Sequence, residues 1–208
     1  MTISIQDSRN YYPNTQSCYT VNIFGNQINT IVTHTPSVVN HFISNVLNKY
    51  RRSTNVIVGL DIEWRPSFSR NQNPPAIIQL CIDNKCLIFQ FLYCRGIPQS
   101  LADFLNNPDF DFVGVGIDGD VEKLERFYDL NVCNAIDVRP FAVERYGDSG
   151  LRNTGMRTLA HVVLDMEIYK PREITLSRWD DAYLSYEQVQ YACVDAYLSY
   201  HLGLELLD

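Results

Sequence analysis

The alternation of apolar and polar positions along the first half of the chain predicts two β-hairpins. Residues 18–24 and 27–32 alternate in polarity around a Gly-Asn pair, a two-residue turn signal that is typical of a hairpin. Residues 76–82 and 85–91 form a second apolar pair around Asp-Asn. We therefore expect at least four strands to enter the sheet through antiparallel neighbours.

Apolar residues with a helical period follow the first hairpin and recur later. Residues 38–50 carry such a stripe, and residues 120–128 and 156–164 predict two shorter helices. The last helix is predicted to begin near Ser185, whose hydroxyl can cap it while Gln188 reaches back in a capping box.

A short β-branched run at residues 55–64 predicts a strand buried on both faces, and residues 111–115 predict another. Because hairpins come first and helices are interspersed later, we expect an α/β fold with a mixed central sheet flanked by α-helices. Residues 1–16 are polar and are predicted to be an irregular N-terminal arm. Residues 1–208 contain no linker-like tract, which indicates a single domain.

Composition narrows the class of protein. The chain has 208 residues, of which 46% are hydrophobic and 20% charged, as in ordinary globular proteins. Its net charge of -7 argues against a broadly basic surface that coats nucleic acid. The six cysteines form no Cys-x-x-Cys pair, which favours reduced, buried thiols over disulfides or zinc. No basic leader and no apolar run of ~20 residues is present, so we expect an intracellular protein of the nucleus or cytoplasm, without membrane association.

Four carboxylates from distant segments are the main candidates for chemistry. Asp61 and Glu63 are two residues apart on a predicted strand, so both point to one face. Asp120 begins a predicted helix, and Asp195 lies four residues after Tyr191 on the last helix, on the same face. Clustered carboxylates are what hard divalent cations require, which predicts a metal-dependent enzyme that cleaves phosphodiesters.

The neighbours of Asp195 support this grouping. Ala192, Cys193 and Ala196 are small, so the last helix can approach the sheet closely and bring Asp195 within reach of Asp61.

A glycine-rich turn offers an alternative. Residues 114–119 read G-x-G-x-x-G, and Asp137 follows at nearly the spacing of a dinucleotide-binding fingerprint. That fingerprint usually lies in the first βαβ unit, whereas here two hairpins and a long helix precede it. We favour a turn that presents Asp120, with Asp118 capping the helix and Asp137 capping the next segment.

Three tracts of this chain resemble known motifs: Asp61-Ile-Glu63-Trp64, Val-Gly-Val-Gly-Ile-Asp-Gly-Asp120 and Tyr191-Ala-Cys-Val-Asp195-Ala-Tyr. They resemble the three exonuclease motifs of the DEDDy group of DnaQ-like 3′-5′ exonucleases, which belongs to the ribonuclease H-like superfamily. Within the group, the likeness is to exonuclease domains of the Werner type. The resemblance implies a ribonuclease H-like fold, a nucleic-acid substrate (DNA, RNA or both) and release of nucleoside 5′-monophosphates from a 3′ end.

The resemblance also implies roles for the site residues. Asp61 would bridge two Mg²⁺ or Mn²⁺ ions, Glu63 and Asp195 would each complete the shell of one ion, and Asp120 would act mainly through metal-bound water. Tyr191 would position the attacking water.

Residues near the motifs are candidates for substrate binding. In the family, the position of Trp64 lies near the substrate cleft, and Trp179 resembles the second member of a Ser-x-Trp pair that helps to shape it. Basic residues on predicted loops are candidate phosphate contacts: Arg65, Arg70, Lys170 and Arg172. Because the chain has few basic residues, we also hypothesise a homo-oligomer whose neighbouring surfaces build the track for the polymer. A catalytically silent nucleic-acid-binding scaffold and, less favoured, a dinucleotide-binding protein are the alternatives.

Overall fold

The computed structural model describes residues 2–8, 15–67 and 71–207. Its strands form a single mixed sheet. The strand bounds are β1 Ile3–Asp7, β2 Gln16–Ile23, β3 Asn26–Thr33, β4 Val56–Glu63, β5 Ile77–Ile82, β6 Lys85–Gln90, β7 Phe110–Gly114 and β8 Ala135–Asp137. The eight strands lie in the order β1-β2-β3-β6-β5-β4-β7-β8, and β4 lies inside the sheet between antiparallel β5 and parallel β7.

Both predicted hairpins are confirmed. The turn between β2 and β3 lies at Phe24-Gly25, one residue before the predicted position, and both residues have positive φ (52° and 98°). Such a pair of left-handed residues matches the twist of the flanking strands. Asp83, with φ of 54°, makes the turn between β5 and β6.

The predicted N-terminal arm is wrong for part of its length. Residues Ile3–Asp7 form β1, which pairs antiparallel with β2 at the edge of the sheet. Ile3 and Ile5 pack against the main core, and this alternation over so few residues was too short to stand out in a polar segment. Residues 1 and 9–14 of the predicted arm lie outside the described part of the chain.

Helices flank the sheet, as predicted. The helix bounds are α1 Pro36–Tyr50, α2 Gln99–Leu105, α3 Asp118–Tyr128, α4 Arg139–Tyr146, α5 Met156–Leu164, α6 Arg172–Thr175 and α7 Tyr186–Leu207, with 3₁₀ turns at Phe91–Tyr93 and Ser149–Asn153. The predicted helices correspond to α1, α3, α5 and α7, while α2, α4, α6 and β8 are short elements that the pattern did not predict.

Both halves of the predicted capping box before α7 are present. The Ser185 backbone N–H donates to Gln188 Oε1 at 2.9 Å, and the Gln188 backbone N–H donates to Ser185 Oγ at 3.2 Å. This cap fixes where α7 begins and therefore which of its residues face the sheet.

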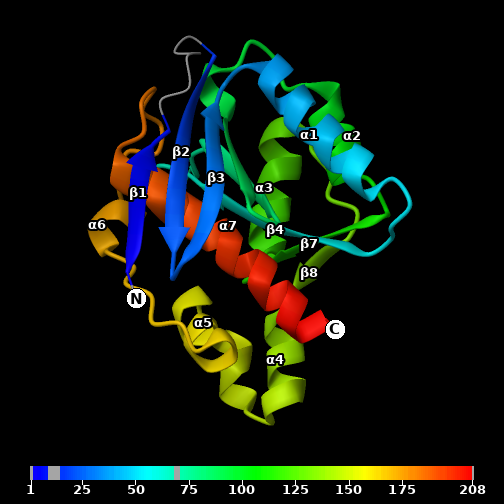
Figure 1. Cartoon of the computed structure of the whole chain (residues 1–208), viewed down its shortest axis with the longest axis vertical. Coiled ribbons are helices and arrows are strands. Elements are labelled where there is room, and N and C mark those ends of the chain that lie inside the picture. The colour runs from blue at the N-terminus through cyan, green and yellow to red at the C-terminus, as the bar shows by residue number, and fades with distance from the viewer. Residues whose placement is uncertain (1, 9–14, 68–70, 208) are drawn as a thin grey trace.

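The long helix α7 crosses one face of the sheet at close range (Figure 1). A Cβ on Gly59 of β4 would collide with the backbone of Ala196 and Tyr200, and a Cβ on Gly203 would lie 2.8 Å from Ile57 Cγ2. Because neither glycine has a side chain at these contacts, α7 lies almost against β4.

Several cysteines lie in the core around the crossing of α7 and β4. No disulfide joins the cysteines of the described residues. Burial is as predicted for Cys81, Cys86 and Cys193, whereas Cys18 and Cys94 are half-buried and Cys133 is exposed. None of the helices in the described part of the chain combines the length and the hydropathy that a membrane crossing requires.

Candidate active site

Three carboxylates from β4 and α7 meet at the crossing. One oxygen from each of Asp61, Glu63 and Asp195 lies within 4.8 Å of the other two. Asp195 is 2% exposed and Glu63 is 9% exposed. The predicted approach of Asp195 to Asp61 is therefore confirmed.

The register of β4 explains why the carboxylates share one site. Gly59, Asp61 and Glu63 alternate along the strand, so their side chains point to the same face, and Gly59 shows that α7 covers that face. Ala192 and Ala196 on α7 are fully buried, and their small size lets Asp195 lie over the end of β4.

Asp120 in the first turn of α3 adds a fourth negative charge. It repels the carboxylates of both Asp61 and Glu63 electrostatically. Burial, opposed by Lys123, raises the pKa of Asp120 to about 7.

Burial and mutual repulsion shift the other carboxylates in the same direction. Burial, then repulsion by Asp195 and Asp120, raises the pKa of Asp61 well above its ordinary value. Burial and the charge of Asp61 do the same to Glu63, and burial raises the pKa of Asp195. The deprotonated cluster is thus unfavourable by itself, and added positive charge would stabilise it.

One carboxylate oxygen of Asp195 indicates which kind of positively charged group would stabilise the cluster. Asp195 Oδ1 is buried and has no hydrogen-bond partner among the described residues. A buried carboxylate oxygen without a partner is costly unless a cation or water completes it. Since all the clustered donors are carboxylates, the residues present fit a hard divalent cation such as Mg²⁺ or Mn²⁺.

Lys170 lies at the cluster, and its contacts differ from those expected of a phosphate contact on an exposed loop. Its Nζ donates to Asp195 Oδ2 at 2.6 Å and lies 4.9 Å from the centre of the Tyr191 ring. Burial opposes the charge, but Asp195, Tyr191 and Asp61 outweigh it and hold the pKa of Lys170 above its ordinary value. In this structure Lys170 is a counter-ion of Asp195.

Tyr191 lies on α7 one turn before Asp195. Its hydroxyl lies 3.0 Å from Thr175 Oγ1, and burial raises the pKa of the phenol to about 12. The side chain is therefore neutral near neutral pH and offers a hydroxyl held in place by Thr175 at the end of α6.

Trp179 packs against the ring of Tyr191. It is 1% exposed, its ring centroid is 5.8 Å from that of Tyr191, and its Nε1 donates to the Thr175 carbonyl at 3.3 Å. Because the ring is covered, any contribution of Trp179 to substrate binding would act through Tyr191 and Thr175, and its predicted role in shaping the cleft stays a prediction. The neighbouring Ser177 Oγ accepts from Gln188 Nε2 at 2.9 Å and fixes the segment to α7.

The other predicted substrate contacts are Trp64, Arg65, Arg172 and Arg70. Trp64 is half-buried, and Lys123 Nζ lies 4.3 Å from its ring centre. Arg65 pairs with Asp180 at 3.1 Å, and Arg172 begins α6. Arg70 lies outside the described residues.

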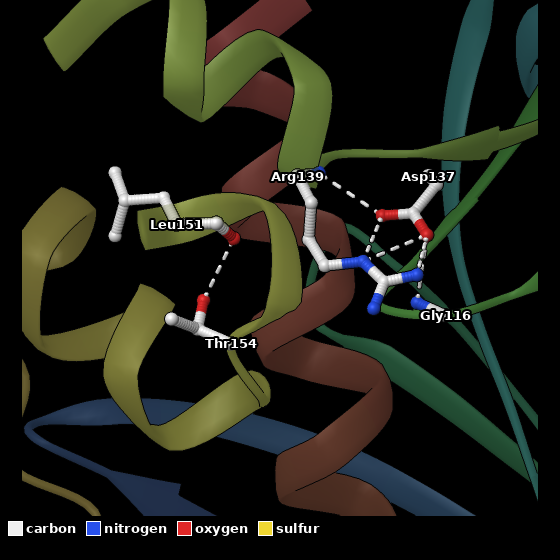
Figure 2. A network of polar contacts seen from close by, with 5 residues as sticks. All are labelled: Gly116, Asp137, Arg139, Leu151 and Thr154. Atoms are coloured by element: carbon white, nitrogen blue, oxygen red, sulfur yellow. Dashed lines mark hydrogen bonds and ion pairs between the residues drawn. The ribbon is translucent and has the colours of Figure 1, made fainter. Parts of the chain in front are cut away.

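The side chain of Asp137 binds the backbone of the glycine-rich turn at residues 114–119 (Figure 2). Asp137 accepts from the backbone N–H of Gly116 at 3.0 Å, from the backbone N–H of Arg139 at 3.0 Å, and from the Arg139 guanidinium. Gly116 has φ of +76°, which explains the glycine. Asp137 thus accepts from the first residue of α4, although Val138 and not Asp137 holds the N-cap position, and it occupies an amide that a cofactor phosphate would need.

The other predicted cap is wrong. Ile117 precedes α3, and Asp118 is already its first residue and makes no capping bond. The turn presents Asp120 to the cluster, which is the role the sequence favoured over dinucleotide binding.

The sequence profile of the 3′-5′ exonuclease family matches residues 21–208, nearly the whole chain. The chain belongs to the 3′-5′ exonuclease family. A 3′-5′ exonuclease of Arabidopsis thaliana is 38% identical over 153 residues, which are 73% of this chain and 52% of that protein. The mouse bifunctional 3′-5′ exonuclease/ATP-dependent helicase WRN is 32% identical over 149 residues, 71% of this chain and 10% of that protein. The chain thus spans about half the length of the first relative and a tenth of the second.

Solved structures share the fold of this exonuclease-family chain. The Nibbler EXO domain of Aedes aegypti has a TM-score of 0.66 at 17% identity and covers 84% of this chain and 85% of its own. Escherichia coli RNase D has a TM-score of 0.69 at 15% identity, with coverage of 85% and 44%. The ribonuclease H-like mixed sheet is confirmed.

A hollow adjoins the exonuclease-type site. It measures about 460 Å³, and its lining includes Lys170, Tyr191 and Asp195 together with Ile3 and Phe24. Strand β1, missed in the sequence, therefore contributes a wall next to the carboxylates. Thr175 was also missed as a partner of Tyr191, since a threonine in a short helix carries no recognisable pattern.

Proposed function

We propose that this chain is a metal-dependent exonuclease that hydrolyses the terminal phosphodiester bond at the 3′ end of a nucleic acid. The observation that carries the proposal is the set of Asp61, Glu63 and Asp195 oxygens within 4.8 Å of one another. Membership of the 3′-5′ exonuclease family supports the direction of attack.

The carboxylates are the residues that would hold the cations. Asp61, Glu63 and Asp195 would bind two Mg²⁺ or Mn²⁺ ions, with Asp120 acting through water. Two such ions can stabilise both the incoming and the leaving oxygen of an in-line displacement at phosphorus. The surplus of negative charge supports this stoichiometry, because Lys170 and Lys123 offset only part of the charge of the three clustered carboxylates and the nearby Asp120.

The protein's own groups would orient the reaction. The neutral hydroxyl of Tyr191, fixed by Thr175, would hold a water molecule against the terminal phosphate. The water oxygen would lose a proton and bond to phosphorus as the P–O3′ bond breaks, and the departing 3′ oxygen would take up a proton in its place. The products would be a nucleoside 5′-monophosphate and a polymer shorter by one nucleotide.

The direct test is digestion of 5′-labelled DNA and RNA oligonucleotides, single-stranded, recessed and blunt. We expect a stepwise ladder from the 3′ end with Mg²⁺ or Mn²⁺, and an intact oligonucleotide with EDTA. Failure to shorten any of these substrates at high protein concentration would refute the proposal, and the panel would reveal the preferred polymer.

One contact favours a second candidate, a silent scaffold that binds nucleic acid without cleaving it. Lys170 already supplies Asp195 with a cation at 2.6 Å, so the fold does not depend entirely on metal. Calorimetric titration with Mn²⁺ separates the two, because the scaffold predicts no saturable binding whereas the exonuclease predicts binding that Asp61→Asn removes.

A further inference from the structure

A buried amide next to the carboxylates lacks any hydrogen bond. Gln79 on β5 is 0% exposed, and neither its Oε1 nor its Nε2 has a partner among the described residues. Buried amides are nearly always paired, because an unpaired one has lost its water without replacement. Both polar atoms of the Gln79 side chain are therefore free to pair with a further group at the site.

The ladder between β4 and β5 places Gln79 beside Asp61. The two residues are direct antiparallel partners, so their side chains lie on the same face of the sheet as neighbours. Gly59 identifies this face as the one that α7 covers. Gln79 therefore lies in the same buried layer as Asp61 and Asp195.

Asp61 is the polar neighbour that the ladder offers. On the other side, the strand partner of Gln79 is Ile88 of β6, and the same-face residues of its own strand are Ile77 and Cys81. All three are fully buried and apolar or weakly polar. An amide donor in this setting has a carboxylate as its natural acceptor.

We propose that Gln79 is a positioning residue for the metal-binding carboxylates. In the cation-loaded protein its Nε2 donates to the carboxylate of Asp61 and orients that group for the ions. This inference rests on the proposed function. A glutamine suits the position, because it reaches across a strand pair and donates without adding charge to a crowded acidic cluster.

The test variant is Gln79→Met, which keeps the length of the side chain and removes its polar atoms. We expect the metal-free melting temperature to stay the same or rise, because the unpaired amide is gone. The dissociation constant for Mn²⁺, measured by calorimetry, should rise about 10–100-fold, as when hydrogen-bond partners of metal ligands are removed elsewhere.

Gln90→Met is the matched control. Gln90 is also buried, at 4% exposure, but its Nε2 donates to the carbonyls of Asp181 and Ala182 at 3.3 and 3.2 Å. This variant should lower the melting temperature and leave the Mn²⁺ affinity unchanged. Gln79→Asn, which keeps the amide but shortens its reach, should weaken Mn²⁺ binding like Gln79→Met.

The outcomes separate the inference from the function on which it rests. Unchanged Mn²⁺ affinity in Gln79→Met, or a loss of stability as large as in Gln90→Met, would overturn the role of Gln79 alone. A wild-type protein that neither binds Mn²⁺ nor cleaves nucleic acid would overturn the proposed function itself.

Discussion

The Nζ of Lys170 donates to the Oδ2 of Asp195 at 2.6 Å, so a lysine side chain neutralises one of the carboxylates that would bind metal. The Asp195 side chain is 3% exposed and that of Lys170 is 24% exposed, so water screens this pair little. A cation that binds Asp195 must compete with this ammonium group. The ion pair thus links the stability of the metal-free protein to its affinity for metal.

Replacing Lys170 with Met should separate these two quantities. Without the ammonium, the buried Asp195 loses its partner, and the metal-free protein should lose up to about 3 kcal/mol of unfolding free energy. The Mn²⁺ affinity should rise, because a competing positive charge has gone. Thermal unfolding with EDTA and calorimetry with Mn²⁺ measure the two effects.

Arg65→Met is the control for this experiment. The Arg65–Asp180 pair is more exposed, with side chains 48% and 29% exposed, so its loss should cost about 1 kcal/mol or less. A Lys170→Met protein with wild-type stability and wild-type Mn²⁺ affinity would show that the ion pair does not control the site.

Asp61→Asn should abolish turnover while leaving the fold intact. Asp61 is one of the residues that would hold the ions. Because a metal ion supplies several kcal/mol of transition-state stabilisation, we expect a loss of at least ~10³-fold in kcat. The amide also removes a charge that repels Asp195 and Asp120, so the metal-free melting temperature should not fall. Rates from single-turnover digestion and thermal unfolding give both numbers, and wild-type rate in this variant would refute the assigned role.

The metal-free protein should become less stable as the pH rises. Folding raises the pKa of Asp120 from 3.8 to about 7, and it also raises the pKa values of Asp61 and Glu63. The folded state therefore binds more protons than the unfolded state between these values, so the contribution of Asp120 is complete below pH 3.8 and is lost as the pH rises through about 7.

Melting curves between pH 5 and 8 with EDTA, buffered at about constant ionic strength, measure this effect. Mn²⁺ should raise the melting temperature more at the alkaline end, where the carboxylates are free of protons. Asp120→Asn should flatten the metal-free profile around pH 7. An equally steep profile in that variant would contradict the assignment.

The chemistry of the site was predictable because it depends on residue types at fixed spacings. Strand alternation places Asp61 and Glu63 on one face, and the small residues of α7 predict the approach of Asp195. The same pattern could not reveal the position of Lys170, because it lies between α5 and α6, where no periodicity constrains the backbone. Whether a loop lysine contacts solvent or Asp195 depends on tertiary packing.

Short elements escaped prediction for a similar reason. Strand β1 has five residues and β8 has three, and at these lengths alternation does not differ from chance. Trp179 resembled a cleft residue in sequence, but its burial depends on how the segment before α7 folds against Tyr191 and Thr175. Local propensity does not encode such contacts.

Gly59→Ala should disrupt the site without touching a carboxylate. The new Cβ would collide with the backbone of Ala196 and Tyr200, so α7 must move away from β4 and carry Asp195 with it. We expect a loss of about 3 kcal/mol, the upper end of overpacking costs, and a melting temperature lower by roughly 6–12 °C. Weaker Mn²⁺ binding and lower kcat should accompany it. Gly96→Ala is the control, because no atom lies within 4 Å of its added Cβ. Equal melting temperatures for the two variants would show that the close approach of α7 to β4 at Gly59 is not required.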